Sequence, residues 1–347
     1  MCKIFGIYLL LILLYEKILN LSSSYTTMVL GKQPLVVIIV ANYNGESVFY
    51  KNKNILWHCL NSLIKTKYDN LKLIVADDSS TDKSILFIKK KFPHVEVLST
   101  KTNGGFSKNF NNAVKIAINK YKPKYIASFN NDIIVTDPLW LKKMLEDINK
   151  HGSVGMIGCK LLYDNNRIQH AGMIINYACM NRGRGEFDKG QYNKKEILNA
   201  VSGAVILIKK DVFDKIGLFD ENFFMGCEDV DFCLRMGQEK LKILYDGNIS
   251  FIHLEGQTST NLKSKNLKLR MFYFSQRNFI YLILKHYRYF KHNLLRSIIS
   301  YFGSALFSIE APNRERKLIN IRLKGNKIHR LYLSITGILD AIKIIKK

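Results

Sequence analysis

Short apolar runs alternate with amphipathic segments between residues 34 and 130. Residues 35–40 are an unbroken run of aliphatic side chains, mostly β-branched, which is typical of a strand buried on both faces. Comparable runs occupy residues 71–76, 95–98 and 125–129. Apolar side chains recur at helical spacing in residues 55–65, 83–91 and 109–119. Strands that alternate with helices predict right-handed βαβ units and a largely parallel sheet.

The pattern changes after residue 152. Up to about residue 256 the apolar runs are shorter and polar turns separate them, which indicates a mixed extension of the same sheet. From residue 261 onward the spacing is mostly helical. We therefore divide the chain into an apolar N-terminal segment (1–33), an α/β domain (34–260) and a helical tail (261–347).

The N-terminal segment contains an apolar run, residues 4–15, behind a single Lys3. The run is shorter than the roughly 20 residues that span a bilayer. Three interpretations stay open: a signal-type segment without a clear cleavage site, an interfacial anchor, and a stretch that precedes a start at Met28.

Composition and charge indicate a globular protein with a strongly basic tail. With 47% hydrophobic and 23% charged residues, the chain reads as globular. Its 53 Lys and Arg against 28 Asp and Glu give a net charge of +25. Residues 261–347 contribute +16 of this charge, with 19 basic residues against only Glu310, Glu315 and Asp340. Because aromatic and aliphatic side chains interleave with the basic ones, the tail favours an anionic membrane surface over nucleic acid. The alternative is a set of packing helices with a solvated basic face.

The six cysteines are scattered, without a CxxC pair or zinc-site spacing. Reduced structural thiols are the simple interpretation, so we expect a cytoplasmic protein, with a peripheral position at the membrane if the tail binds lipid.

Acidic clusters follow the apolar runs. Asp77 and Asp78 follow residues 71–76, and Asp132 follows residues 125–129, while Glu228, Asp229 and Asp231 form a third cluster. Carboxylates that lie close together repel one another, so a cluster indicates a metal, a basic group or a reaction that uses them. In parallel sheets, ligands bind at the carboxyl ends of the strands. The clusters therefore predict one site that handles a nucleotide diphosphate and a cation.

The motifs around these residues resemble those of family 2 glycosyltransferases, in particular the branch that contains rhamnosyltransferases. The matching segments are VIIVANYNG (37–45), VADDSSTD (75–82), NGGFS (103–107), FNND (129–132), GLFDENFF (217–224) and EDVD (228–231). Each is weak alone, but together they cover about residues 35–260 in the family's order.

The resemblance implies the GT-A fold, a Rossmann-like nucleotide-diphospho-sugar transferase architecture with a mixed sheet flanked by helices, here with a basic C-terminal helical extension. It also implies a Mg²⁺ or Mn²⁺ cofactor. The expected partners are a dTDP-, UDP- or GDP-sugar donor and a glycan or lipid-linked glycan acceptor, and no nucleic acid.

The resemblance also implies roles for particular residues in donor binding. The nucleotide-sugar site would contain Ala41, Asn42, Tyr43, Asp78, Gly105, Lys108, Asn130, Asn131, Asp132 and Gly203. Asp132 and His253 would be the metal ligands, and Lys108 would face the pyrophosphate, because Phe110 stands where the family often has arginine. Ordinary structural roles stay open: a helix N-cap for Asp78, loop packing for Tyr43, an Asx-turn for Asp132 and a structural histidine at 253.

The catalytic pair implied by the resemblance is Asp229 and Glu228. Asp229 would take the proton from the acceptor hydroxyl, and Glu228 would position hydroxyl groups. A solvated acidic helix start is the alternative. His170 would face the donor sugar or the acceptor, and Arg277 and Asn278 would contact acceptor phosphate or join the tail to the core.

Two functional hypotheses follow. The first is an inverting, cation-assisted glycosyltransferase with Asp229 as its general base. The second is a non-catalytic nucleotide-sugar-binding protein on the same fold, which fold alone does not exclude.

Overall fold

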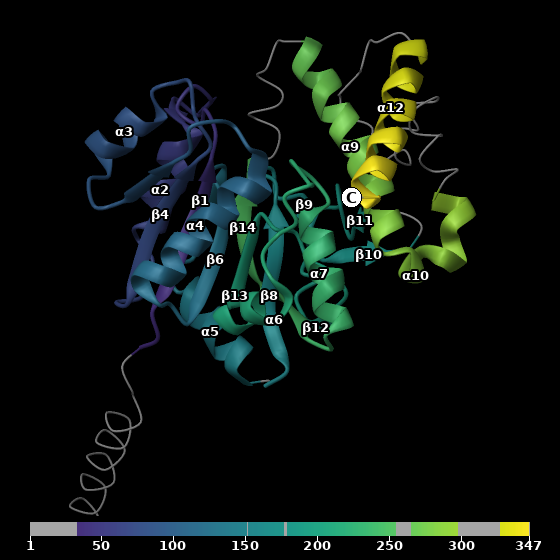
Figure 1. The fold of residues 1–347 in the computed structure, drawn as a ribbon. Coiled ribbons are helices and arrows are strands. Elements are labelled where there is room, and N and C mark those ends of the chain that lie inside the picture. The colour runs from purple at the N-terminus through teal and green to yellow at the C-terminus, as the bar shows by residue number, and fades with distance from the viewer. Residues whose placement is uncertain (1–32, 151, 177–178, 255–264, 298–326, 347) are drawn as a thin grey trace, which may run out of the picture.

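A computed structural model describes residues 33–150, 152–176, 179–254, 265–297 and 327–346 of the protein. Its centre is a ten-stranded sheet with helices on both faces (Figure 1). The main path of the sheet runs β12-β14-β8-β13-β6-β1-β4-β5, with β7 added to β14 and β9 added to β8. The predicted N-terminal segment lies outside the described residues, except for its last position.

The first half of the sheet is parallel, as the sequence predicts. Its strands are β1 (Val36–Asn42), β4 (Leu71–Asp77), β5 (Glu96–Ser99) and β6 (Tyr125–Asn130), and every pair among them is parallel. The helices of this half are α2 (Ile55–Leu63), α3 (Ser84–Lys91) and α4 (Gly105–Tyr121). Helix α4 begins at Gly105, four residues before the predicted start at residue 109.

The second half is mixed. Strand β13 (Val205–Lys209) runs antiparallel to both β6 and β8 (Val154–Leu162), whereas β14 (Lys242–His253) is parallel to β8. Shorter strands complete it: β7 (Ile133–Val135), β9 (Ile168–His170) and β12 (Lys195–Leu198). Two hairpin-like pairs lie outside the sheet: β2 (Phe49–Tyr50) with β3 (Lys53–Asn54), and β10 (Met173–Ile175) with β11 (Cys179–Asn181). The mixed α/β fold expected from the sequence is confirmed.

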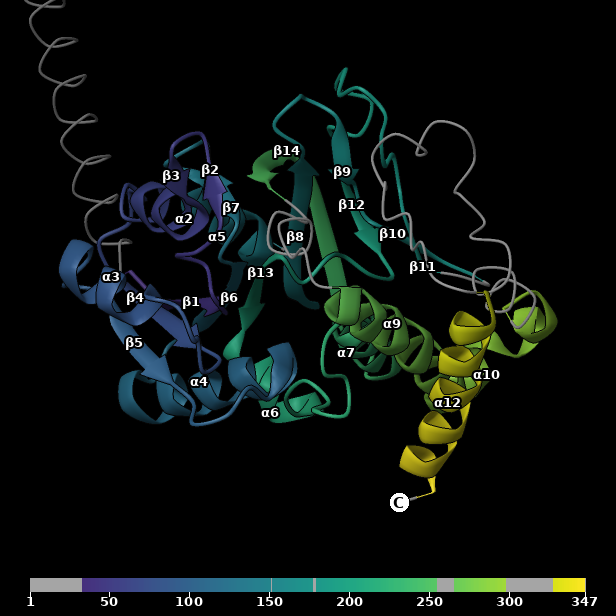
Figure 2. The same ribbon diagram turned by 90° about the horizontal axis from the view of Figure 1, so that it is seen from above.

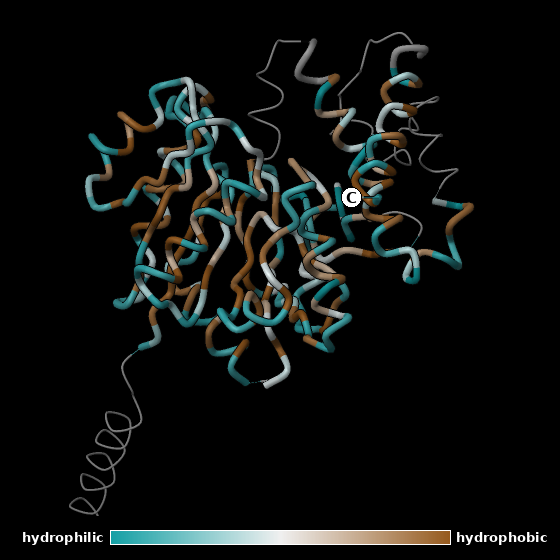
Figure 3. The backbone as a smooth tube through the Cα atoms, in the orientation of Figure 1, coloured by the Kyte–Doolittle hydropathy of each residue, from teal (hydrophilic) through white to brown (hydrophobic). Residues whose placement is uncertain are grey.

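Strand β1 shows why the sheet is covered on both sides. Successive strand side chains point to opposite faces. Val37 and Ile39 therefore join the core beneath α4 and α7 (Glu228–Gln238), whereas Ile38 joins the core beneath α2 and α5 (Trp140–Lys150). All three side chains are completely buried. Figure 3 shows the result, with the hydrophobic segments concentrated along the central strands.

The described residues of the tail form helices α9 (Lys265–Lys285), α10 (Tyr287–Phe290) and α12 (Lys327–Ile345), together with a 3₁₀ turn (Lys291–Asn293). Helix α12 packs along α9 (Figure 2). At their crossing the backbone of Arg277 lies so close to Gly337 that a Cβ there would be 3.1 Å from its nitrogen. Nearby, the Tyr273 hydroxyl donates to Asp340 Oδ2 at 2.7 Å. Within the described residues, no helix combines the length and the apolar character that crossing a bilayer requires.

Candidate active site

A cavity of about 680 Å³ opens at the carboxyl ends of strands β1, β4 and β6. The three carboxylates Asp78, Asp132 and Asp229, which are far apart in the sequence, all line it. So do most of the other predicted site residues: Ala41, Asn42, Tyr43, Gly105, Asn130, Asn131, Gly203, Glu228 and His253. The structure therefore brings the predicted site together in one place.

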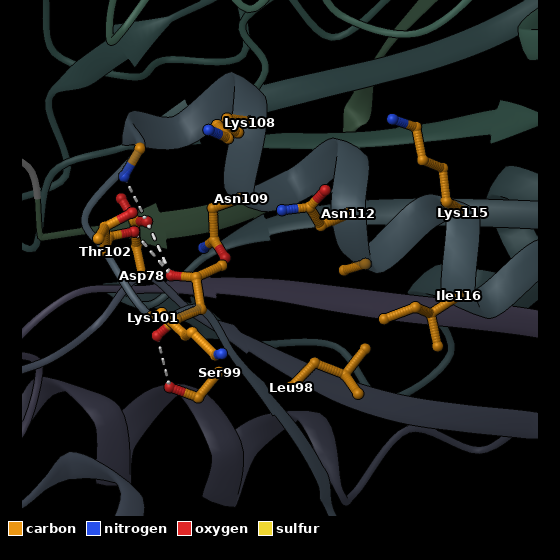
Figure 4. Close-up of a pocket in the computed structure, with 13 residues that line it drawn as sticks. Asp78, Leu98, Ser99, Lys101, Thr102, Lys108, Asn109, Asn112, Lys115 and Ile116 are labelled. Atoms are coloured by element: carbon orange, nitrogen blue, oxygen red, sulfur yellow. Dashed lines mark hydrogen bonds between the residues drawn. The ribbon is translucent and has the colours of Figure 1, made fainter.

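Lys108 is the exception. It lines a second cavity of about 450 Å³, between the loop after β5 and helix α4 (Figure 4). Lys101 and Lys115 line this second cavity as well, and Asp78 lies on the border between the two. Since helix α4 carries Lys108 on the side of the second cavity, the structure does not bring its amine into the large one.

A chain of buried amides ties the three strand ends together. Asn131 Nδ2 donates to Asn42 Oδ1 at 2.7 Å, and Asn42 Nδ2 donates to Asp77 Oδ2 at 2.7 Å. The side chains of Asn42 and Asn131 are thus engaged with protein partners, and they fix the spacing of β6, β1 and β4. Asn130 is less buried than Asn131 and lines the cavity.

Asp78 organises the glycine turn before α4. Its Oδ1 accepts from the Gly104 amide at 2.9 Å, and its Oδ2 accepts from the Gly105 amide at 2.8 Å. Burial raises the pKa of Asp78, which these amides partly offset. Gly105 has a φ of +82°, and a Cβ there would lie 2.1 Å from the Phe224 carbonyl oxygen. The turn therefore requires glycine, and Asp78 holds one wall of the cavity in place.

Asp132 and His253 meet because of strand register. Strands β7 and β14 are antiparallel with His253 opposite Ile133, so His253 lies beside the residue that precedes β7. His253 Nε2 is 3.1 Å from Asp132 Oδ1, and its Nδ1 is 3.0 Å from Gln169 Oε1. Because an amide oxygen accepts, Nδ1 carries a proton. Nε2 then directs either a second proton or a lone pair at the carboxylate.

A divalent cation fits this arrangement. A neutral imidazole would place its lone pair against a carboxylate oxygen, and a cation between them would remove that repulsion. Mg²⁺ and Mn²⁺ accept carboxylate ligands, Mn²⁺ also accepts imidazole, and substrate phosphates commonly complete such sites. Two protein ligands are consistent with this, because no group of three or more His, Cys, Asp or Glu with metal-site geometry occurs among the described residues.

Glu228 and Asp229 open helix α7 at the cavity wall. The Gly203 amide donates to Asp229 Oδ2 at 2.9 Å, and a Cβ on Gly203 would lie 3.1 Å from Asp229 Cβ. Burial raises the pKa of Asp229. Burial and the neighbouring Asp229 raise the pKa of Glu228 to about 8, and its buried Oε2 has no hydrogen-bond partner. A carboxylate with a raised pKa is suited to accept a proton near neutral pH.

Asp231, the third acid of the cluster, forms hydrogen bonds and ion pairs within the protein. It is completely buried and accepts from His286 Nε2 and Lys285 Nζ, each at 2.8 Å, and from Arg235 Nε at 2.9 Å. Burial alone would raise its pKa, but the hydrogen bond from His286 and the nearby cations lower the pKa to about 2. Asp231 therefore joins helix α7 to the tail.

Asn278 makes a second connection between tail and cavity. Its side chain is completely buried in α9, and its Nδ2 donates to the carbonyls of Met225 at 2.9 Å and Gly226 at 2.8 Å. These residues precede Cys227, a non-glycine residue with a φ of +72° at the start of α7. Of the two sequence interpretations of Asn278, the structure supports the one that joins tail to core.

His170 is also engaged within the protein. Its Nε2 accepts from the Ser202 amide at 3.0 Å, so Nδ1 carries the proton and donates to Asn181 Oδ1 at 3.0 Å. Burial lowers the pKa of His170 to about 4, which keeps the ring neutral at physiological pH. The ring supports the segment that ends in Gly203 and does not line the cavity.

Among the residues of the cavity wall that sequence reasoning missed, three carry chemistry or charge that bears on the site. Gln169 orients His253, while Arg270 and Phe274 come from helix α9. The position of Gln169 next to His170 was a signal for Gln169. Arg270 and Phe274 had no local signal, because they reach the cavity only through the packing of the tail.

The fold and the cavity together define a GT-A type protein with an acidic cleft at its strand ends. Residues 37–217 match the model of glycosyl transferase family 2, and the chain belongs to that family.

Curated relatives include an uncharacterized protein, y4gI, of Sinorhizobium fredii, which is 30% identical over 58% of this chain and 22% of its own length. The O-antigen biosynthesis protein RfbC of Myxococcus xanthus is 26% identical over 49% of this chain and 16% of its own. The chain thus spans about a fifth of these relatives. The rhamnosyltransferase WbbL of Escherichia coli is 25% identical over 67% of this chain and 88% of its own.

Solved structures support the fold. The mannosyltransferase PcManGT from Pyrobaculum calidifontis, in complex with GDP-Man and Mn²⁺, aligns with a TM-score of 0.51 over 90% of this chain and 86% of its own, at 13% identity. GalNAc-T7 with UDP, GalNAc and Mn²⁺ aligns with a TM-score of 0.52 over 73% of this chain and 48% of its own, at 14% identity.

The environment of Glu228 predicts a pH-dependent stability. Because the pKa of Glu228 is about 8 in the folded state and near 4.5 when unfolded, ionisation opposes folding. The free energy of unfolding should therefore fall as pH rises from about 4.5 through 8. Glu228→Gln removes this loss, so its Tm should equal that of the wild type at pH 5 and exceed it at pH 9. Differential scanning calorimetry checks this, with Glu146→Gln, at an exposed position of helix α5, as control. Parallel curves for Glu228→Gln and wild type would show that the carboxyl is not protonated in the fold.

Proposed function

We propose that the protein is an inverting glycosyltransferase that moves a sugar from a nucleotide-diphosphate donor to a hydroxyl group of an acceptor. The observation that carries this proposal is the convergence of Asp78, Asp132 and Asp229 on one 680 Å³ cavity. Membership of family 2 supports the same reaction class. A protein that only bound nucleotide sugars would not need a buried carboxylate of raised pKa in the same cavity.

In this proposal the cavity divides into two functional parts. Asp78, with the glycine turn that it holds, forms the nucleotide end, and Ala41 and Tyr43 line the same end. Asp132 and His253 would hold Mg²⁺ or Mn²⁺, which when bound supplies positive charge to the departing nucleoside diphosphate. Mn²⁺ in two solved structures of the same fold supports a divalent cation.

Asp229 would act as the general base. Its Oδ2 is fixed by the Gly203 amide, and its Oδ1 accepts from the Val230 amide at 2.8 Å, so the carboxylate has a defined orientation. It would take the proton of the acceptor hydroxyl as that oxygen attacks the anomeric carbon. Glu228, protonated near neutral pH, would donate a hydrogen bond to a sugar hydroxyl.

The acceptor we propose is a glycan or a lipid-linked glycan, and the sugar transferred is a hexose or deoxyhexose such as rhamnose. The names of two relatives, an O-antigen biosynthesis protein and a rhamnosyltransferase, support a role in the synthesis of surface polysaccharides.

We also propose a cytoplasmic protein that lies at the membrane surface. Helix α12 supports this, because Tyr332, Ile335 and Leu339 are exposed by 61%, 47% and 54% and share one face, which continues into Lys343. Replacing Tyr332 and Leu339 with serine should reduce pelleting with vesicles that contain 30% anionic lipid by roughly tenfold. Equal pelleting of the variant and the wild type would contradict membrane binding through α12.

A donor-hydrolysis screen tests the proposed reaction. The full chain is incubated with dTDP-, UDP- and GDP-sugars and Mn²⁺ or Mg²⁺, and release of nucleoside diphosphate is measured. We expect slow, metal-dependent hydrolysis of at least one donor. Absence of both binding and hydrolysis across the three nucleotide classes would contradict the proposed function.

A further inference from the structure

The large cavity is rich in carboxylates and poor in cations. Asp78, Asp132, Glu228 and Asp229 line it, whereas Arg270 is its single Lys or Arg lining residue within the described part of the chain. A nucleotide diphosphate or a phosphorylated acceptor would bring further negative charge. Among the described residues that line this cavity, Arg270 is therefore the cationic side chain that can bind an anionic group directly.

Arg270 is exposed and held by aromatic rings. Its guanidinium carbon lies 4.9 Å from the Phe224 ring centroid and 5.6 Å from that of Phe274. The two rings are stacked, with centroids 4.6 Å apart and an interplanar angle of 9°. The structure gives Arg270 no carboxylate partner among the described residues. A guanidinium over an aromatic face keeps its fork of N–H donors free, and that fork matches phosphate oxygens.

The rings that carry Arg270 are fixed to the rest of the site. The Phe106 amide donates to the Phe224 carbonyl at 2.8 Å, and Gly105 lies against the same carbonyl. Phe224 is also close in sequence to Met225 and Gly226, whose carbonyls accept from Asn278. Arg270 is thereby held between the glycine turn and the start of helix α7.

Two other sources of positive charge are already engaged or point elsewhere. The amides of Gly104 and Gly105 at the start of α4 donate to Asp78, and the next amide donates to Phe224. The amine of Lys108 belongs to the second cavity (Figure 4). Neither leaves a free cationic group directed into the large cavity.

We infer that Arg270 is a phosphate-binding residue of the active-site cavity, supplied by the C-terminal helix α9. The inference rests on the proposed function and adds the residue that recognises the anion. Its ligand is a phosphoryl or diphosphoryl group, which can come from the leaving nucleoside diphosphate or from a phosphate on the acceptor. In both cases the basic tail is part of the active site and not only a surface for lipid.

The test measures binding of inorganic diphosphate to the full chain with Mn²⁺ by isothermal titration calorimetry. We expect Arg270→Ala to weaken binding roughly 10- to 100-fold, since a hydrogen bond to a charged group contributes about 1.5–3 kcal/mol. Arg270→Lys should recover only part of the loss, because it keeps the charge without the fork. Arg288→Ala, an exposed arginine on α10 outside the cavity, is the control and should bind as the wild type does.

Two further titrations separate the sources of the phosphate. Weaker binding of UDP, GDP or dTDP to Arg270→Ala, with uridine, guanosine or thymidine binding unchanged, assigns the leaving group. Weaker binding of a hexose 1-phosphate to protein saturated with nucleoside diphosphate, with free hexose unchanged, assigns the acceptor.

Inorganic diphosphate that binds Arg270→Ala within twofold of the wild type, or fails to bind the wild type, would overturn the inference. If diphosphate binding depends on Arg270 but no nucleoside diphosphate binds, the proposed function is wrong. The assignment of Arg270 as an anion-binding residue would still hold.

Discussion

Asp229→Asn should lower turnover by roughly 10³-fold while it changes donor affinity by less than about threefold. Asparagine keeps the size of the side chain and can still accept from the Gly203 amide at 2.9 Å. It cannot take a proton, so the attacking hydroxyl would lose its base. The substitution removes the base but no group that binds the donor. We therefore expect kcat to fall and the donor Kd to remain nearly unchanged.

The control for this experiment is Asp211→Asn. Asp211 is an exposed acid in the first turn of helix α6 (Lys210–Ile216), so it shares the local setting of Asp229 but not the cavity. Stopped-time assays with saturating donor give kcat, and calorimetry gives the donor Kd. Equal kcat values for Asp229→Asn and wild type would exclude Asp229 as the base, whichever reaction the protein catalyses.

Asp132→Asn should abolish metal-dependent turnover, with a loss of at least roughly 10³-fold, because metal-supplied charge stabilisation contributes several kcal/mol. Removal of the metal with EDTA should have the same effect on the wild type. Gln169→Leu removes only the acceptor that orients His253, so we expect roughly 10- to 100-fold weaker Mn²⁺ binding. Asp132→Asn should weaken Mn²⁺ binding more than Gln169→Leu does, because Asp132 would bind the cation directly, whereas Gln169 would act through His253.

Mn²⁺ binding in the presence of nucleoside diphosphate, measured by electron paramagnetic resonance, checks this ordering independently of activity. Asp137→Asn is the control, since Asp137 lies near Asp132 in sequence but pairs with Lys143 at the surface. If Asp132→Asn and Asp137→Asn bind Mn²⁺ with the same affinity, Asp132 is not a ligand of the cation. The cation then binds elsewhere or does not bind to the protein.

The fold and much of the site could be predicted because their signals are local. Strands 35–40, 71–76 and 125–129 are predominantly apolar, and the polar residues that follow them must meet at one edge of a parallel sheet. Convergence of Asp78 and Asp132 follows from that rule alone. The strand pattern does not predict where the segment that contains Asp229 lies. Asp229 was predicted as a site residue from the family resemblance, and the family match confirms that resemblance.

The remaining features depend on side-chain direction and on long-range packing. Lys108 precedes the helix expected over residues 109–119, but α4 begins at Gly105, so Lys108 lies within this helix and lines the other cavity. Arg270 lies about 40 residues after Asp229, and only the docking of α9 through Asn278 and Asp231 brings it to the cavity. The local sequence pattern therefore predicts neither the cavity that Lys108 lines nor the position of Arg270.

Phe110 shows how the fold explains a departure from the family pattern. It is completely buried, stacked on Phe106 at 5.6 Å and edge-on to Phe219 at 5.4 Å. An arginine there would place a charge in an aromatic core. The family resemblance implies that arginine is frequent at this position, and we expect Arg270 to supply the corresponding charge here.

A crystal structure of Asp229→Asn with Mn²⁺ and the donor found in the hydrolysis screen is the most direct measurement. We expect an anomalous manganese peak within coordinating distance of Asp132 and His253, the nucleotide against Asp78, and the anomeric carbon facing residue 229. A manganese peak and a donor bound away from Asp132, or a sugar on the far side of the sheet from residue 229, would contradict a single cleft for an activated sugar.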